Sequence, residues 1–158
     1  MEDDGGEEGG GQMSKTLFME TTKISTDQTV SQIQKILGLY GASAILIEYD
    51  KQEVSSISFK VKIENAEVPF RLPCRWKSIY ELIKRKRARI RNYEVIEEQA
   101  KRVAWRQILR WIEAQMALVE TDMVKIQEVF LPYMQVGINE TLFDRIEAGK
   151  FKALTEGE

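Results

Sequence analysis

The chain contains no histidine. It therefore cannot supply an imidazole general base, a Ser-His-Asp or Cys-His catalytic arrangement, or an imidazole metal ligand. Its only glycine cluster lies in the acidic first twelve residues and lacks the lysine and the strand–helix context of a phosphate-binding loop. These absences exclude most hydrolase mechanisms, and we expect a non-enzymatic protein with no cofactor and no bound metal.

One enzymatic alternative needs no histidine, namely a Mg²⁺ site built from carboxylates alone. Glu48, Asp50 and Glu53 resemble the strand-end acids of metal-dependent nucleases. They lie at an expected hairpin turn, where acidic residues are common for conformational reasons. Ordinary turn composition is therefore the favoured interpretation.

The chain has a single cysteine and no long apolar run. Cys74 cannot form an internal disulfide, which fits a reducing compartment. No stretch of 18 or more apolar residues is present, and the N-terminus is acidic, unlike a secretory signal. We expect a cytoplasmic protein that does not enter a membrane.

The charges are segregated along the 158 residues although their formal sum is only −2. The first twelve residues carry five acids and no cation. Residues 71–110 hold thirteen Lys or Arg against four Glu, whereas residues 111–158 hold four cations against nine acids. We therefore expect a bipolar surface with a basic middle third.

Composition and hydrophobic periodicity indicate an α+β fold: a small antiparallel sheet in β-α-β-β-β order, followed by a helical C-terminal half with one long helix. Residues 1–13 are expected to be a disordered, acidic, glycine-rich tail, because they have too little apolar content to offset the entropy of ordering. Residues 14–148 form the single domain, with a sheet part at 14–73 and a helical part at 75–148. Residues 149–158 are expected to fray.

The strands and the first helix follow from local patterns. Residues 15–22 read as a first strand, and the capping sequence at 25–28 begins a helix that Gly41 ends. The nearly continuous apolar run at 42–49 is typical of a central strand, followed by a four-residue turn at 50–53. Alternation at 54–63 predicts a half-buried strand. Pro69 and Pro73 remove donors from the last strand, so we expect it to lie at an edge or to end early.

Helical periodicity begins near Trp76 and continues to the C-terminus. A long helix is predicted from about Tyr93 to Thr121, with a wide apolar stripe that implies deep burial. Two short helices at 124–131 and 141–148 close the chain, separated by Pro132 and Gly137.

Residues 84–91 read K-R-K-R-A-R-I-R and hold the densest positive charge of the chain. The six cations are Lys84, Arg85, Lys86, Arg87, Arg89 and Arg91. On a helix these side chains would point to all sides of the helix axis and repel one another. Contact with phosphates would be favourable, because the counterions condensed on a nucleic acid are then released. We therefore interpret the run as a phosphate-binding segment. The alternative is a solvated helix whose cations pair with Glu94, Glu97 and Glu98.

Further cations could enlarge this surface. Arg102, Arg106 and Arg110 repeat at i, i+4 and i+8 along one edge of the long helix. Their alternative role is local pairing with Glu98 or Glu113, which contributes only about 0.3 kcal/mol per exposed pair. The polar sheet face adds Lys60, Lys62 and Arg71, provided that it turns to the same side.

The three tryptophans have both a packing and a binding interpretation. Trp111 falls in the apolar stripe and is expected to be structural. Trp105 and Trp76 adjoin arginines and could either pack in the core or stack on unpaired bases. No RNP-type aromatic signature, zinc-knuckle spacing or helix-turn-helix pattern is present.

Two segments, P-F-R-L-P-C-R-W at residues 69–76 and E-Q-A-K-R-V-A-W-R-Q-I-L-R-W-I-E-A-Q-M-A-L-V-E at residues 98–120, resemble segments of small uncharacterised proteins of bacterial prophages and related mobile elements. The resemblance covers most of residues 15–146. It implies no activity, cofactor or functional residue, but it implies a setting in which DNA-handling and host-interference proteins are both frequent.

We therefore expect a nucleic-acid-binding accessory protein that contacts the phosphate backbone of DNA or RNA through a basic helical segment. The alternative is a protein–protein interaction or regulatory protein of the host-interference type that uses the same charged surface. Self-association between oppositely charged regions, giving a homo-oligomer, belongs to that alternative.

Overall fold

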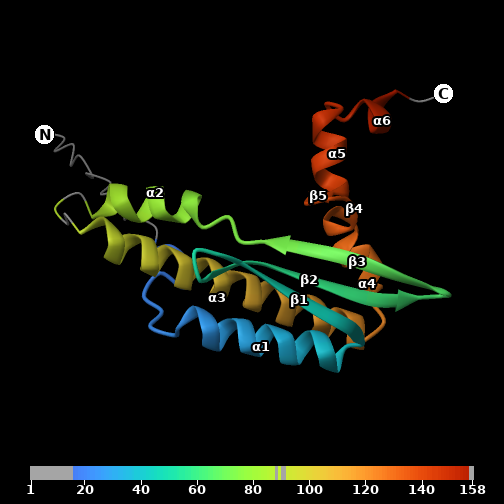
Figure 1. The fold of residues 1–158 in the computed structure, drawn as a ribbon, viewed down its shortest axis with the longest axis horizontal. Coiled ribbons are helices and arrows are strands. Elements are labelled where there is room, and N and C mark those ends of the chain that lie inside the picture. The colour runs from blue at the N-terminus through green and yellow to red at the C-terminus, as the bar shows by residue number, and fades with distance from the viewer. Residues whose placement is uncertain (1–15, 88, 90–91, 157–158) are drawn as a thin grey trace, which may run out of the picture.

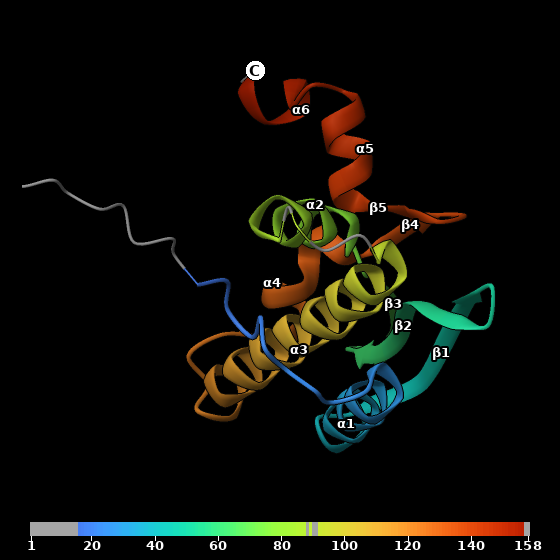
Figure 2. The same cartoon turned by 90° about the vertical axis from the view of Figure 1, so that its left-hand side faces the viewer.

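The computed structural model describes residues 16–87, 89 and 92–156. The α+β class predicted from the sequence is confirmed (Figure 1). Strands β1 (Ala42–Asp50), β2 (Glu53–Ile63) and β3 (Ala66–Pro73) form an antiparallel sheet in the order β1-β2-β3. Helices α1 (Thr26–Leu39) and α3 (Tyr93–Glu120) lie side by side against one face of this sheet, and no helix of the described residues covers the other face (Figure 2).

The remaining elements surround this two-layer body. Helix α2 (Lys77–Lys86) packs on the N-terminal half of α3 through Ile83. After α3 come α4 (Ile126–Phe130), a 3₁₀ turn η1 (Leu131–Tyr133), the short hairpin β4 (Gln135–Gly137) and β5 (Glu140–Thr141), and helices α5 (Leu142–Ala148) and α6 (Lys152–Thr155).

The core lies between the sheet and the two long helices. Ile57, Phe59 and Phe70 point from the sheet toward α1 and α3, and each is at most 2% exposed. Phe130 closes the end of the core with its ring 5.2 Å from that of Phe59, in an edge-to-face arrangement. Trp105 is 1% exposed in this core, so packing rather than base stacking explains that tryptophan.

Helix boundaries follow the predicted signals closely. The Ser25 hydroxyl accepts a hydrogen bond from the Gln28 amide at 3.2 Å, which satisfies a free N–H group at the start of α1. Gly41, with a φ of +98°, occupies the left-handed conformation directly after the helix. The long helix and the two closing helices also lie where they were predicted, within a few residues.

Three predictions about the strands are wrong. Residues 18–21 form a turn, and no strand precedes α1 within the described residues. β1 lies at an edge of the sheet rather than at its centre, which β2 occupies. The turn between them has only two residues, Lys51 and Gln52, whose φ values of +48° and +70° suit a tight hairpin.

Two terminal predictions have different outcomes. The predicted disordered tail, residues 1–13, lies outside the described residues. The predicted frayed end contains the single-turn helix α6, which comes after α5. A network of polar contacts lies at the start of α5.

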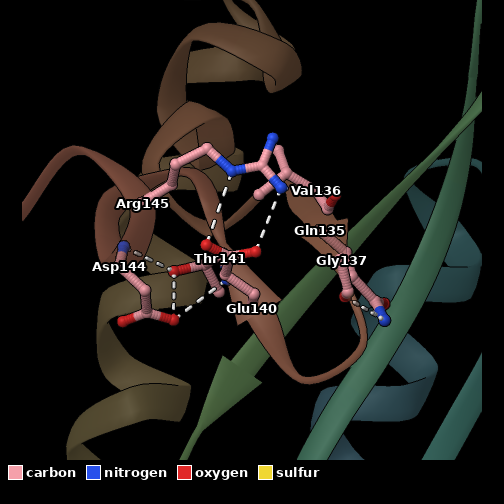
Figure 3. A network of polar contacts seen from close by, with 7 residues as sticks. All are labelled: Gln135, Val136, Gly137, Glu140, Thr141, Asp144 and Arg145. Atoms are coloured by element: carbon pink, nitrogen blue, oxygen red, sulfur yellow. Dashed lines mark hydrogen bonds and ion pairs between the residues drawn. The ribbon is translucent and has the colours of Figure 1, made fainter. Parts of the chain in front are cut away.

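This network ties the β4–β5 hairpin to α5 (Figure 3). Asp144 Oδ2 accepts hydrogen bonds from the backbone N–H of Thr141 at 2.9 Å and from its hydroxyl at 2.8 Å. Arg145 bridges the Val136 carbonyl and the Glu140 carboxylate, both at 3.0 Å. A capping box therefore fixes the direction in which α5 leaves the hairpin.

Within the described residues, none of the helices combines the length and the hydropathy needed to span a bilayer.

Candidate nucleic-acid interface

The basic run lies at one end of the molecule, on the last turn of α2 and in the loop that leads to α3 (Figure 1). Ile83 is fully buried against Ile96, Ala100 and Val103, so the helix is anchored by its apolar side. Lys84, Arg85 and Lys86 are exposed in the final turn of α2, where the partial negative charge of the helix C-terminus favours cations. Arg87 is half-buried, Arg89 is exposed, and Arg91 lies outside the described residues.

Carboxylates neutralise few of these cations. Lys86 lies 3.5 Å from the Glu20 carboxylate. Within the described part of the chain, the other four make no ion pair with a carboxylate, and we call them the basic end: Lys84, Arg85, Arg87 and Arg89.

Two tyrosine rings, rather than a carboxylate, contact the Lys84 ammonium group. Its ammonium nitrogen lies 5.7 Å from the ring centroid of Tyr80 and 5.2 Å from that of Tyr93, within the range of cation–π attraction. Among the described residues, Lys84 makes no ion pair with the downstream glutamates, contrary to the alternative prediction. Glu97 pairs with Lys101 at 2.9 Å instead.

The three arginines predicted to line the long helix do not form one exposed stripe. Arg106 is only 3% exposed, and it donates to the Gln32 side-chain oxygen at 2.6 Å and to the Thr29 hydroxyl at 3.5 Å. Its guanidinium group therefore lies in the contact between α3 and α1, where a phosphate cannot reach it.

The other two arginines make local contacts. Arg102 donates twice to the Gln99 side-chain oxygen, at 2.6 and 3.0 Å. Arg110 pairs with Glu113 at 2.7 Å, as the local-pairing alternative predicted. Gln99, which the sequence did not single out, also donates to the carbonyls of Glu20 and Thr22 and so fastens the segment before α1 to α3.

The sheet cations lie away from the basic end. Lys60 and Lys62 are exposed near the end of β2, close to the β2–β3 turn, which lies at the opposite end of the molecule from the α2–α3 loop (Figure 1). Arg71 pairs with Glu48 at 3.1 Å on the helix-free face. The structure therefore does not bring these three residues together with the basic end.

The acids of the alternative metal site are engaged elsewhere. Glu48 accepts a hydrogen bond from the buried Ser56 hydroxyl, and this bond, helped by Arg71, holds the pKa of Glu48 below its ordinary value. Glu53 contacts Lys101 instead of turning toward Glu48. In the part of the chain that the structure describes, no group of three or more His, Cys, Asp or Glu side chains is placed to hold a metal ion.

The remaining aromatic and thiol groups have packing roles. Trp76 lies under the Lys101 ammonium at 4.7 Å, and Trp111 packs edge-on against Phe130 at 5.4 Å. Burial raises the pKa of the Cys74 thiol to about 12, which makes it a poor nucleophile at neutral pH.

No family model, curated protein or solved structure matches the chain. The resemblance to prophage proteins therefore stays a prediction.

Proposed function

We propose that the protein is a non-enzymatic nucleic-acid-binding protein that holds the phosphate backbone with its basic end. The observation that carries this proposal is that four cations, Lys84, Arg85, Arg87 and Arg89, gather on an anchored helix end without a described carboxylate partner. Uncompensated positive charge on a fixed element favours a polyanion over a small acid, because each phosphate contact releases counterions from the nucleic acid.

The contacts available at the basic end predict weak sequence preference. Arg and Lys side chains reach phosphate oxygens readily, and such contacts fix position without reading bases. Among the described residues of α2 and its loop, Asn92 is the one side chain of the Asn or Gln type, and its oxygen caps α3 by accepting from the Val95 amide at 3.5 Å. Binding is therefore expected to depend on salt far more than on sequence.

The first test is a fluorescence-anisotropy titration with a labelled duplex and a single strand of the same length, each over a salt series. The variant Lys84→Gln/Arg85→Gln/Arg87→Gln removes three cations and leaves Ile83 in place. If all three contact phosphates of duplex DNA, the slope of log K against log salt flattens by about 2.7, which is three contacts at about 0.9 each. Comparison of the two ligands separates duplex from single-strand binding.

The matched control is Lys35→Gln/Lys62→Gln/Lys152→Gln, which removes the same charge from exposed sites away from α2. Its slope should stay near that of the wild type. Equal losses in the two variants would show that net charge alone matters. No binding by the wild type at low salt would rule the proposal out and favour an acidic protein surface as the partner of the basic end.

A further inference from the structure

Strand β1 has the sequence of a central strand but lies at the edge of the sheet. Its middle residues, Ala-Ile-Leu-Ile at 44–47, are all apolar, yet among the described residues β1 pairs with β2 alone. Figure 2 shows β1 at the outer margin of the sheet, where it begins beside the end of α1. Every second residue of such a strand directs its N–H and C=O groups away from the sheet, where they can pair with another strand.

The usual protection of an edge strand, by bulges and charges, is confined to the two ends of β1. β1 contains no proline and no lysine, and its two register shifts, between Ala42 and Ala44 and between Glu48 and Tyr49, leave residues 44–48 regular. Leu46, in the middle of this regular segment, is 61% exposed. The Leu46 side chain is therefore largely open to solvent on its face of the sheet.

We propose that β1 pairs antiparallel with β1 of a second copy of this chain, about a two-fold axis at Leu46. The two three-stranded sheets then become one sheet of six strands, in which both β1 strands are central. Such an interface is isologous, because the same five residues supply both sides of it.

The side chains of the regular segment complement themselves in this register. Antiparallel pairing about Leu46 places Ile45 of each copy opposite Ile47 of the other copy. Both isoleucines share the face of Phe59 and Ile57, their partners on β2, and both are only half-buried in the single chain. The dimer would therefore continue the apolar layer across the axis, with Leu46 facing its own copy on the other side of the sheet.

The charges also match. Glu48 comes opposite Ala44 of the second copy, and the β2 neighbour of Ala44 is Lys60. Directly paired residues share a face of the sheet, so the long Lys60 side chain can pass over the small Ala44 side chain toward Glu48 of the other copy. Within the described residues Lys60 has no ion pair, whereas Glu48 already pairs with Arg71 through Oε2, so its second oxygen would have to turn toward Lys60 of the other copy.

A segment of five residues buries less than a standard protein interface, so association in the micromolar range is expected. Sedimentation equilibrium of the full chain without nucleic acid, from about 1 µM to about 200 µM, should show the mass rising from 18.3 kDa toward twice that value. Leu46→Lys places like charges at the axis and should weaken association at least tenfold, whereas Ile138→Lys, at a 94% exposed site in the β4–β5 turn, should not.

A cross-link provides an independent readout. Leu46→Cys brings two thiols together at the axis, so mild oxidation should give a covalent dimer, which neither the wild type nor Ile138→Cys forms to the same extent. Leu46 is exposed in the single chain, so the circular dichroism spectra of its variants should match that of the wild type. A monomer at every concentration, or a dimer that Leu46→Lys leaves intact, would overturn this interface whatever the chain does with nucleic acid.

Discussion

At the residue scale, Arg106 shows why spacing alone cannot assign a side chain to a surface. Arg102, Arg106 and Arg110 are equally spaced on α3, and the sequence gives them the same interpretation. Arg106 differs because α1 crosses its side of α3, with Gln32 and Thr29 facing it. That contact joins residues more than seventy positions apart, and helical periodicity contains no information about it.

Arg106 is also unusual because its buried positive charge has no carboxylate partner among the described residues. Its described partners are neutral oxygens, and its Nε atom is buried without a hydrogen-bond partner. Burying a guanidinium ion without a carboxylate is costly, so an apolar side chain of similar length should be tolerated. We expect Arg106→Met to leave the free energy of unfolding within about 1 kcal/mol of the wild type, or to raise it, in urea denaturation.

The same variant separates a packing role from a binding role. Arg106→Met should leave the affinity for nucleic acid and its salt slope unchanged, because the guanidinium is inaccessible. The exposed Arg110→Met serves as the control for loss of one charge. A drop in stability of more than about 2 kcal/mol would mean that the hydrogen bonds to α1 outweigh the burial of charge.

At the element scale, helices were predicted better than strands because their signals are local. The Ser25 cap and the wide apolar stripe of α3 are contained in the segments that they define. Strand order is not local, and the apolar run of β1 indicates burial without saying what buries it. The β4–β5 hairpin was missed because strands of three and two residues are too short to show alternation.

The cap of α5 gives an element-scale prediction. Thr141 is 2% exposed, and its hydroxyl accepts from the Asp144 backbone N–H at 3.3 Å while donating to the Asp144 carboxylate. Thr141→Ala should lower the free energy of unfolding by about 1 kcal/mol at pH 7, as measured by thermal or urea denaturation. Thr21→Ala, at an exposed site before α1, is the control and should have little effect.

This loss should depend on pH. Hydrogen bonds from the Thr141 backbone N–H and, second, from its hydroxyl hold the pKa of Asp144 below its ordinary value of 3.8. A carboxyl whose pKa is lowered by folding stabilises the folded state above its unfolded pKa and loses that contribution as the pH falls through the folded value. Alanine keeps the backbone N–H bond and removes the hydroxyl bond, so the part of the loss that comes from the hydroxyl–carboxylate contact should disappear below about pH 3.8; a difference that stays constant there would argue against that contact.

At the scale of the whole molecule, the sequence located the basic run but not its surroundings. The run is contiguous, so its position could be read directly, whereas the placement of Lys60 and Lys62 depends on the direction of β2 relative to α2. The structure puts these two groups of cations at opposite ends (Figure 1). The predicted single basic surface is therefore replaced by one compact basic end.

The basic end and the β1 edge together predict how a dimer would act on nucleic acid. β1 runs toward the end of the molecule that carries the α2–α3 loop (Figure 1). A two-fold axis across β1 reverses one copy, so the two basic ends would point away from each other. Such a dimer can hold two separate nucleic-acid segments but cannot place both basic ends on one short fragment.

A bridging assay tests this arrangement, which depends on both proposals. Wild-type protein above its dimerisation constant should let a bead-bound duplex capture a second, fluorescent duplex. Leu46→Lys should bind each duplex singly, with little change in the salt slope, but should capture at least tenfold less of the second one. Lys84→Gln/Arg85→Gln/Arg87→Gln should dimerise and capture none, and Ile138→Lys should behave as the wild type. Capture that survives Leu46→Lys would place the bridging contact on a surface other than β1, because only that edge is blocked by the substitution.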